Sequence, residues 1–239
     1  MVEKVYALLK SLGTTPEEVV LKWVEEGKID LDRIAELVKQ NAQNKSSEVK
    51  KAKEVKAGMF LTKNKKICSE YNPDECVAVV LKVFADSREA LMLNIVGKKL
   101  AFSSGGIDTD TSGFSSLNAT HFVKQMAEDA KVAAEAANYC LEFENDFVEK
   151  GSAFLLSKEE VESLEYNEDL RKAFDAAKLS DKTFWTVTTP ADNLKPDDET
   201  YKTAYMFDLR GSKISLHSEY VRLPLDVHPA YVVKLNQIL

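Results

Sequence analysis

The sequence predicts an α+β protein in which strand patterns and helix patterns occupy separate stretches of the chain. Two short apolar runs rich in β-branched residues, at 76–84 and 90–96, are typical of buried strands. A long amphipathic pattern follows, in which apolar residues from Phe122 to Cys140 recur every three or four positions, as on one face of a helix. The C-terminal part of the chain returns to strand patterns, and this order of elements favours an α+β fold class.

The first 55 residues are expected to form a small helical segment that ends in a linker. Thr15 can cap a helix whose first and third positions are Pro16 and Glu18, an arrangement that gives side-chain partners to exposed backbone N–H groups. The stretch 43–54 is polar and lysine-rich, which is typical of a solvated connection. We therefore expect a helical segment over 1–55 and an α+β domain over 56–239.

Further elements are expected in the second part of the chain. A loop over 103–116, rich in Ser, Gly, Asp and Thr, leads into the long helical pattern. Ser157 and Glu160 have capping-box spacing and predict the start of a short helix, and a second helical stretch covers 167–177. Strands are predicted at 183–188, 201–209, 213–217 and 220–223, with 210–212 as a hairpin turn.

Charge and hydropathy narrow the classes of partner. The chain has 239 residues, a formal net charge of −7 and a pI near 5.2, which disfavours broad attraction to nucleic acid. No run approaches the roughly 18 apolar residues of a membrane span, and the N-terminus lacks the basic and apolar regions of a secretion signal. We expect no membrane partner and a cytoplasmic location.

Cysteine and histidine spacing predicts no metal framework. Cys68, Cys76 and Cys140 form no CxxC pair, and no histidine stands at zinc-finger spacing from them. Cys68 and Cys76 could join across a short loop, but reduced thiols are favoured in a chain without a secretion signal. We expect no cofactor from these residues.

Calcium is a weaker alternative. Asp108 and Asp110 stand at alternate positions with Gly113 at the sixth, which matches the first half of a calcium-binding loop. Position twelve is Ala119 instead of the bidentate glutamate, and no helix pattern precedes the loop. A plain turn-rich loop is favoured, with calcium-dependent glycan binding through the two aspartates as the alternative.

No catalytic constellation stands out in the sequence. The G-x-S-x-G elbow and the phosphate-binding G-x-x-x-x-G-K-[ST] loop are both absent. Trp185 could anchor a core or stack on a ligand, and the core role is favoured. An enzyme with its site in the loop 188–201, near Asp192, Asp197 and Asp198, remains an open alternative.

Four segments, taken in order, resemble a bacterial and prophage domain, much of it of unknown function, whose fold is C-type-lectin-like. They are Asp108-Thr-Asp110 with Asn118-Ala-Thr120; the alanine-rich stretch 133–140; the stretch 153–164, which is similar to W-x-L-P-S-x-x-E-L; and 184–188, which is similar to Y-W-S-S-T. Residues 220–223 resemble the closing V-R strand of that domain. Phe154 stands near the expected tryptophan and Leu156 replaces the proline, so the third match is degraded.

The resemblance implies two helices packed on an antiparallel sheet over 56–239. It also implies a ligand-facing surface formed by Trp185, Asp192, Asn193, Asp197 and Tyr201. Related groups include formylglycine-generating enzymes and retroelement variable proteins. The enzyme group uses a late cysteine pair, but no cysteine follows Cys140; the calcium-dependent lectins use E-P-N or Q-P-D, but this chain has Lys195-Pro196-Asp197.

Together these observations favour a non-enzymatic binding or structural module of bacterial or phage origin. Its ligand is expected to be a protein or a glycan that the sequence does not identify. A phage-particle location is an alternative to the cytoplasm. The N-terminal helices could dock or form a homo-oligomer.

Overall fold

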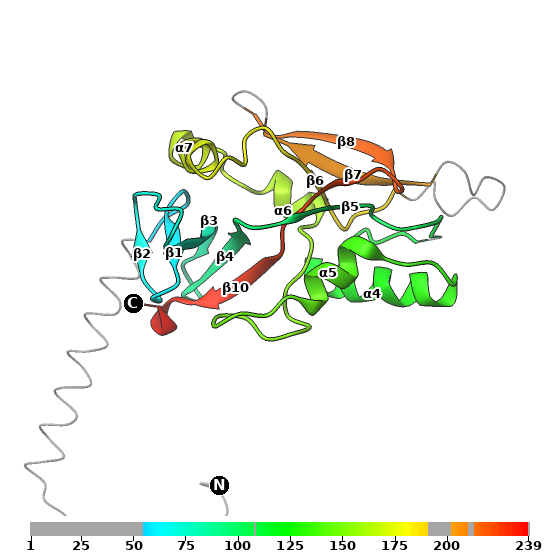
Figure 1. Ribbon diagram of the computed structural model, residues 1–239, viewed down its shortest axis with the longest axis horizontal. Coiled ribbons are helices and arrows are strands. Elements are labelled where there is room, and N and C mark those ends of the chain that lie inside the picture. Colours follow the sequence, from blue (N-terminus) through cyan, green and yellow to red (C-terminus); the bar gives the residue numbers. More distant parts are fainter. Residues whose placement is uncertain (1–54, 108, 191–201, 210–212, 239) are drawn as a thin grey trace, which may run out of the picture. The chain divides into compact units, whose positions relative to one another are not determined.

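The computed structural model describes residues 55–107, 109–190, 202–209 and 213–238, and these residues form an α+β structure (Figure 1). The described part contains two five-stranded sheets, a short 3-10 helix η3 (Leu235–Gln237) and four α-helices: α4 (Ser116–Asp129), α5 (Glu135–Glu142), α6 (Lys158–Glu162) and α7 (Glu168–Ala176). The α+β fold class predicted from the sequence is confirmed. The predicted N-terminal helices and the predicted turn 210–212 lie outside the described residues.

Sheet A is antiparallel and has the order β10-β4-β3-β1-β2. Its strands are β1 (Phe60–Thr62), β2 (Ile67–Cys68), β3 (Cys76–Phe84), β4 (Glu89–Asn94) and β10 (Ala230–Lys234). The two apolar runs predicted as buried strands are therefore β3 and β4. They lie at the centre of the sheet because both of their faces carry apolar side chains.

Sheet B has the order β5-β9-β6-β7-β8 and contains one parallel pair, β6 with β9. Its strands are β5 (Lys98–Leu100), β6 (Thr183–Trp185), β7 (Thr203–Asp208), β8 (Ser215–Tyr220) and β9 (Leu225–Val227). The structure thus differs from the expected pair of helices on one antiparallel sheet, since it has two sheets and four helices in the described residues. The strand predicted at 220–223 is also absent, because Tyr220 ends β8 and a turn leads into β9.

The helix predicted from Phe122 to Cys140 is two helices, α4 and α5. Helix α4 ends at Asp129, and Lys131 adopts a left-handed conformation with φ of 56°. The N–H of Val132 then bonds to the carbonyl of Ala127, which is the Schellman arrangement usually built with glycine. Ser104 stabilises the chain after this break: its backbone N–H donates to the carbonyl of Ala133, and its hydroxyl accepts a hydrogen bond from the N–H of Ala133. The sequence has no glycine or proline at this point, so its helical pattern gives no sign that one helix ends and another begins.

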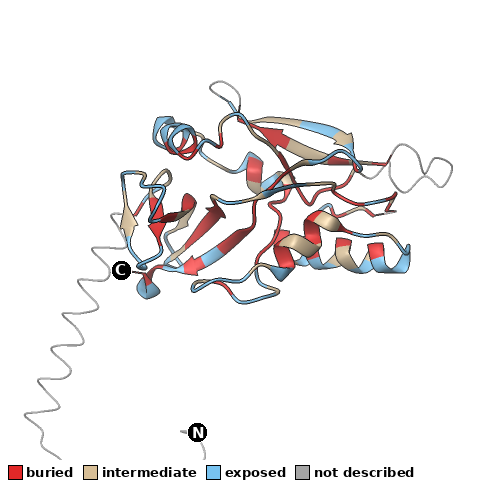
Figure 2. Ribbon diagram, in the orientation of Figure 1, coloured by how far each residue is buried: buried red, intermediate tan, exposed pale blue. Residues whose placement is uncertain are grey.

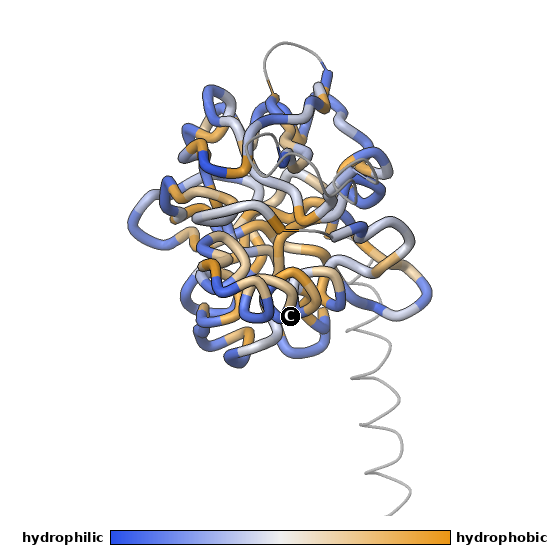
Figure 3. The backbone as a smooth tube through the Cα atoms, turned by 90° about the vertical axis from the view of Figure 1, so that its right-hand side faces the viewer, coloured by the Kyte–Doolittle hydropathy of each residue, from blue (hydrophilic) through white to orange (hydrophobic). Residues whose placement is uncertain are grey.

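Three clusters of buried apolar side chains fill the described part of the chain. The first lies between sheet A, strands β6 and β7 of sheet B, and helices α6 and α7. The second lies between the other face of sheet B and helices α4 and α5, and the third covers the other face of sheet A. Figure 2 shows the buried residues concentrated in the sheets and on the inner faces of the helices. In Figure 3 the hydrophobic residues lie mainly inside and the hydrophilic residues mainly outside. Both sheets are therefore packed on two faces.

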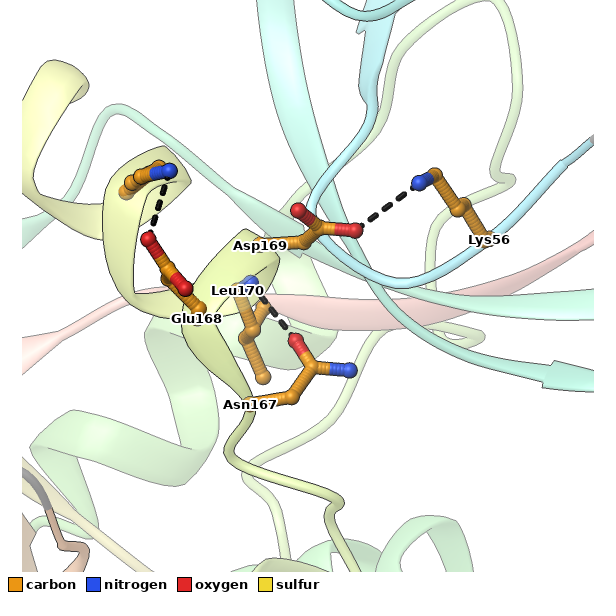
Figure 4. Close-up of polar contacts among 6 residues, drawn as sticks. Lys56, Asn167, Glu168, Asp169 and Leu170 are labelled. Atoms are coloured by element: carbon orange, nitrogen blue, oxygen red, sulfur yellow. Dashed lines mark hydrogen bonds and ion pairs between the residues drawn. The ribbon is translucent and has the colours of Figure 1, made fainter.

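Helix α7 closes the first cluster over sheet A and is fixed at its N-terminus by polar contacts (Figure 4). The side chain of Asn167 accepts a hydrogen bond from the N–H of Leu170 at 3.0 Å, as an N-cap should. Lys56 reaches across from the start of the described chain and pairs with Asp169 at 2.8 Å. The pair is exposed, so it positions the chain more than it stabilises it.

Candidate functional site

Trp185 lies in the core and not on a ligand-facing surface. Its side chain is 2% exposed, packs edge-on against Phe102 and donates its indole N–H to the carbonyl of Leu100 at 3.1 Å. Alternate residues of β6 enter different clusters, so that Phe184 faces the first and Trp185 the second. Of the two roles considered for Trp185, the structure places it in the core role.

The loop that carries Asp110 lies against the end of β6. The hydroxyl groups of Thr109 and Thr189 form a hydrogen bond of 2.9 Å, and the hydroxyl of Thr111 donates to the carbonyl of Val187 at 3.1 Å. The N–H of Thr189 in turn bonds to the hydroxyl of Thr111. These buried threonines bring together two segments that the sequence singled out separately.

The carboxylate of Asp110 is engaged within its own turn. It accepts hydrogen bonds from the backbone N–H and the hydroxyl of Ser112, at 2.9 and 2.5 Å. These bonds to Ser112 lower the pKa of the exposed Asp110 carboxyl, because they favour its ionised form. Among the residues that the structure describes, no group of three or more His, Cys, Asp or Glu side chains could hold a metal ion.

The other sequence candidates fall outside the described residues. They are Asp108 of the proposed calcium loop, Asp192, Asn193, Asp197 and Tyr201 of the proposed ligand-facing loop, and Asp198 of the alternative enzyme site. The described part of that loop ends at Pro190, directly after the threonines that tie it to the Asp110 segment.

The open edge of sheet A offers a site that sequence reasoning did not find. Strand β10 is the outermost strand, and Ala230 exchanges both backbone hydrogen bonds with Phe154 on that outer side. Because antiparallel backbones alternate direction, the polar backbone groups of Val232 and Lys234 face the same outer side. No described strand pairs with them. This leaves a short unpaired edge next to Phe154.

A groove of about 660 Å³ runs beside this edge. It is lined by Val232 and Lys234 of β10 and by residues from the segment after α5 and from the starts of α4 and α6. Apolar side chains supply most of its surface: Leu117, Phe147, Val148 and Phe154 are apolar, while Ser115, Ser116, Ser152, Glu149 and Glu160 are polar. Val232 itself is 40% exposed. We refer to this feature as the β10 groove.

A hydrogen-bond network between α4 and α6 includes two residues that line the β10 groove, Ser116 and Glu160. Ser116 donates its hydroxyl proton to the carboxylate of Glu160 and accepts the N–H of Ser157 at 2.6 Å. Ser157 caps α6 by accepting the N–H of Glu160 at 3.1 Å, which confirms the helix start predicted from the sequence. Ser116 lies between the two residues of the predicted capping box, so it joins the starts of two helices.

Partial burial raises the pKa of the Glu160 carboxyl above its usual value, because the charged form loses solvation. The Ser116 hydroxyl, the Ser157 N–H and the charge of Lys82 act in the opposite direction. Ser116 is 1% exposed and both its proton and a lone pair are used, so its attack on a substrate would break its bonds to Glu160 and to the Ser157 N–H. We assign Ser116 and Glu160 a positioning role in the groove lining.

Comparison with known proteins gives no neighbour from which a function could be transferred. No protein-family model, no curated protein and no solved structure matches the chain. Within the described residues, no helix is long and apolar enough to cross a membrane. The assignment of function therefore depends on the site itself.

Proposed function

We propose that this protein is a binding module that takes an extended polypeptide segment into the β10 groove as an added strand. The observation that carries the proposal is the pair of outward-facing backbone positions at Val232 and Lys234 beside a preformed groove. Strand addition uses such an edge for main-chain hydrogen bonds and a neighbouring pocket for side chains. The choice of a protein over a glycan as ligand follows from this edge.

The chemistry of the groove specifies the ligand further. Phe147, Val148 and Leu117 offer apolar contacts for an anchoring side chain. The charged residues that line the groove are the acidic Glu149 and Glu160 and the basic Lys234, so acidic groups outnumber basic ones. We therefore propose a ligand with an apolar anchor and a basic residue near it, because opposite charge favours association.

We also propose that residues 56–239 are a variant of the C-type-lectin-like fold, from a bacterial or phage protein. This proposal rests on the resemblance of the sequence segments. It is supported by the return of the C-terminal strand β10 to the sheet formed by the first strands, and by the helices α4 and α5 that follow the early strands. A solved relative with the same strand order would test it.

The groove is tested with a displayed library of random peptides selected on the immobilised full chain. The test variant is Val232→Pro, which removes an N–H that the sheet itself does not use; proline is accepted on edge strands for this reason. Val232→Thr is the matched control, because it keeps the N–H and the β-branched shape. We expect the selected peptides to carry the apolar and basic residues and to bind the wild type and V232T but not V232P.

Hydrogen exchange on the wild type provides a second measurement that does not depend on the proline variant folding. A bound peptide should slow exchange at the amides of Val232 and Lys234. Peptides that bind V232P as well as the wild type, or that leave both amides unprotected, would show that the edge is not the site.

A further inference from the structure

We propose that Cys68 and Cys76 form a dithiolate binding site for a soft metal ion of low coordination number, such as Cu(I). The two sulfur atoms lie 3.9 Å apart, one at the end of β2 and one at the start of β3. Both thiols are free, and thiolate sulfur is the ligand type that selects Cu(I). The site is independent of the β10 groove, which is at the opposite edge of sheet A.

The distance between the sulfurs suits one bridging ion. Metal–thiolate bonds of about 2.3 Å place two sulfurs about 3.8 Å apart at a tetrahedral angle and about 4.6 Å apart in a linear arrangement. The observed 3.9 Å is close to the tetrahedral value, and a linear arrangement would need the sulfurs to move about 0.7 Å further apart. An ion could therefore enter with little movement of either side chain.

A disulfide is the alternative use of this pair. Strand β1 lies between the two cysteines, with Phe60 opposite Cys68 and Thr62 opposite Cys76. The sulfur atoms are 3.9 Å apart, whereas a disulfide bond is about 2.0 Å long. Closing the bond therefore needs a further approach of the two sulfurs, which a bridging ion does not need.

Binding is balanced without an oxidant or a reductant. Cu(I) forms two Cu–S bonds as two S–H bonds break, and both protons pass to solvent. The N–H of Asn72 already donates to the Cys76 sulfur at 3.3 Å, and this contact stabilises the thiolate. Cys68 is only partly buried, so the ion can reach the pair from solvent.

The test uses the full chain, reduced with a phosphine and titrated without oxygen with Cu(I) in competition with a coloured Cu(I) chelator. We expect the wild type to withdraw a single ion per chain, and Cys68→Ala and Cys76→Ala to lose this capacity. Cys140→Ala is the matched control, because Cys140 is fully buried among α4 and α5 and should leave binding unchanged.

Circular dichroism of each variant separates loss of the site from loss of the fold. Cys68 is partly exposed, so C68A decides the matter if C76A fails to fold. A wild type that cannot compete with the chelator, or a C68A variant that competes equally well, would overturn the proposal. So would ready formation of a Cys68–Cys76 disulfide with oxidised glutathione and an unchanged spectrum, because it would show that the pair is built to form a disulfide.

Discussion

Acidification should destabilise this protein through one histidine, His228. The side chain is 4% exposed, its Nδ1 lies 2.8 Å from the carbonyl of Asn94 and its Nε2 is buried without a partner. Burial, and to a lesser extent the charge of Lys182, lower the pKa of His228 from 6.5 to about 4, although Asn94 and Asp226 oppose the shift. The folded protein therefore holds this imidazole neutral.

The sign and size of the effect follow from the two pKa values. The unfolded chain binds a proton at His228 below pH 6.5, whereas the folded chain does so only near pH 4. Stability from this residue is thus complete above pH 6.5 and is lost as the pH falls toward 4. With these values the free energy of unfolding falls by about 2 kcal/mol between pH 7 and pH 5.

Urea unfolding at pH 7 and pH 5 measures this loss. A Trp23→Phe background leaves Trp185 as the only tryptophan, so fluorescence reports on the core around Trp185. His228→Asn can keep a donor to Asn94 but cannot be charged, so we expect it to remove most of the pH-dependent loss. His217→Asn, on an exposed position of β8, is the control and should behave as the wild type does. The reasoning is refuted if H228N and the wild type lose equal stability between the two pH values.

Three further substitutions test the local geometry by the same urea unfolding at pH 7. Lys131→Gly should stabilise the protein by about 1 kcal/mol, because Lys131 has a left-handed conformation that glycine adopts without strain. Gln125→Gly, within α4, is the control and should cost about 1 kcal/mol. Equal effects of the two substitutions would contradict the argument from the Lys131 conformation. Gly97→Ala should cost about 1–3 kcal/mol, because the added Cβ would lie 2.5 Å from the carbonyl oxygen of Val227 and from the His228 ring. Val96→Ala, at a 70% exposed position, is the control and should change the free energy of unfolding by no more than about 0.5 kcal/mol. Ser116→Ala should cost about 2–3 kcal/mol, because the Ser157 N–H and the Glu160 carboxylate both lose the Ser116 hydroxyl as a partner. Ser115→Ala is the control, since its capping bond is 3.5 Å long. A cost for Ser116→Ala no greater than that for Ser115→Ala would argue against the network.

The sequence was a good guide wherever a signal was local. The strands β3 and β4 follow from continuous apolar runs, and the starts of α6 and α7 follow from Ser157 and from the helical pattern after Asn167. It failed where a distant group decides the outcome. The break between α4 and α5 has no glycine or proline, because the backbone of Ala133 is satisfied by Ser104 from a loop far away in sequence.

The candidate sites divide in the same way. Trp185 on a predicted strand could be either a core anchor or a stacking surface for a ligand. The structure assigns it to the core, because alternate residues of β6 enter two different apolar clusters and Trp185 lies in one of them. Ser116 and Glu160 are 44 positions apart and carry no shared motif, so only the packing of α4 beside α6 reveals their contact. Strand β2 and the edge position of β10 are likewise consequences of pairing between distant segments.

By itself, the sequence determined the fold class, the central strands and the Ser157 cap of α6, because these depend on neighbouring residues. Only the tertiary structure decided which strand is left at an edge, which serine joins two helices and which two thiols meet. Those features arise from contacts between residues far apart in the chain, and such contacts leave no periodic pattern in a single sequence.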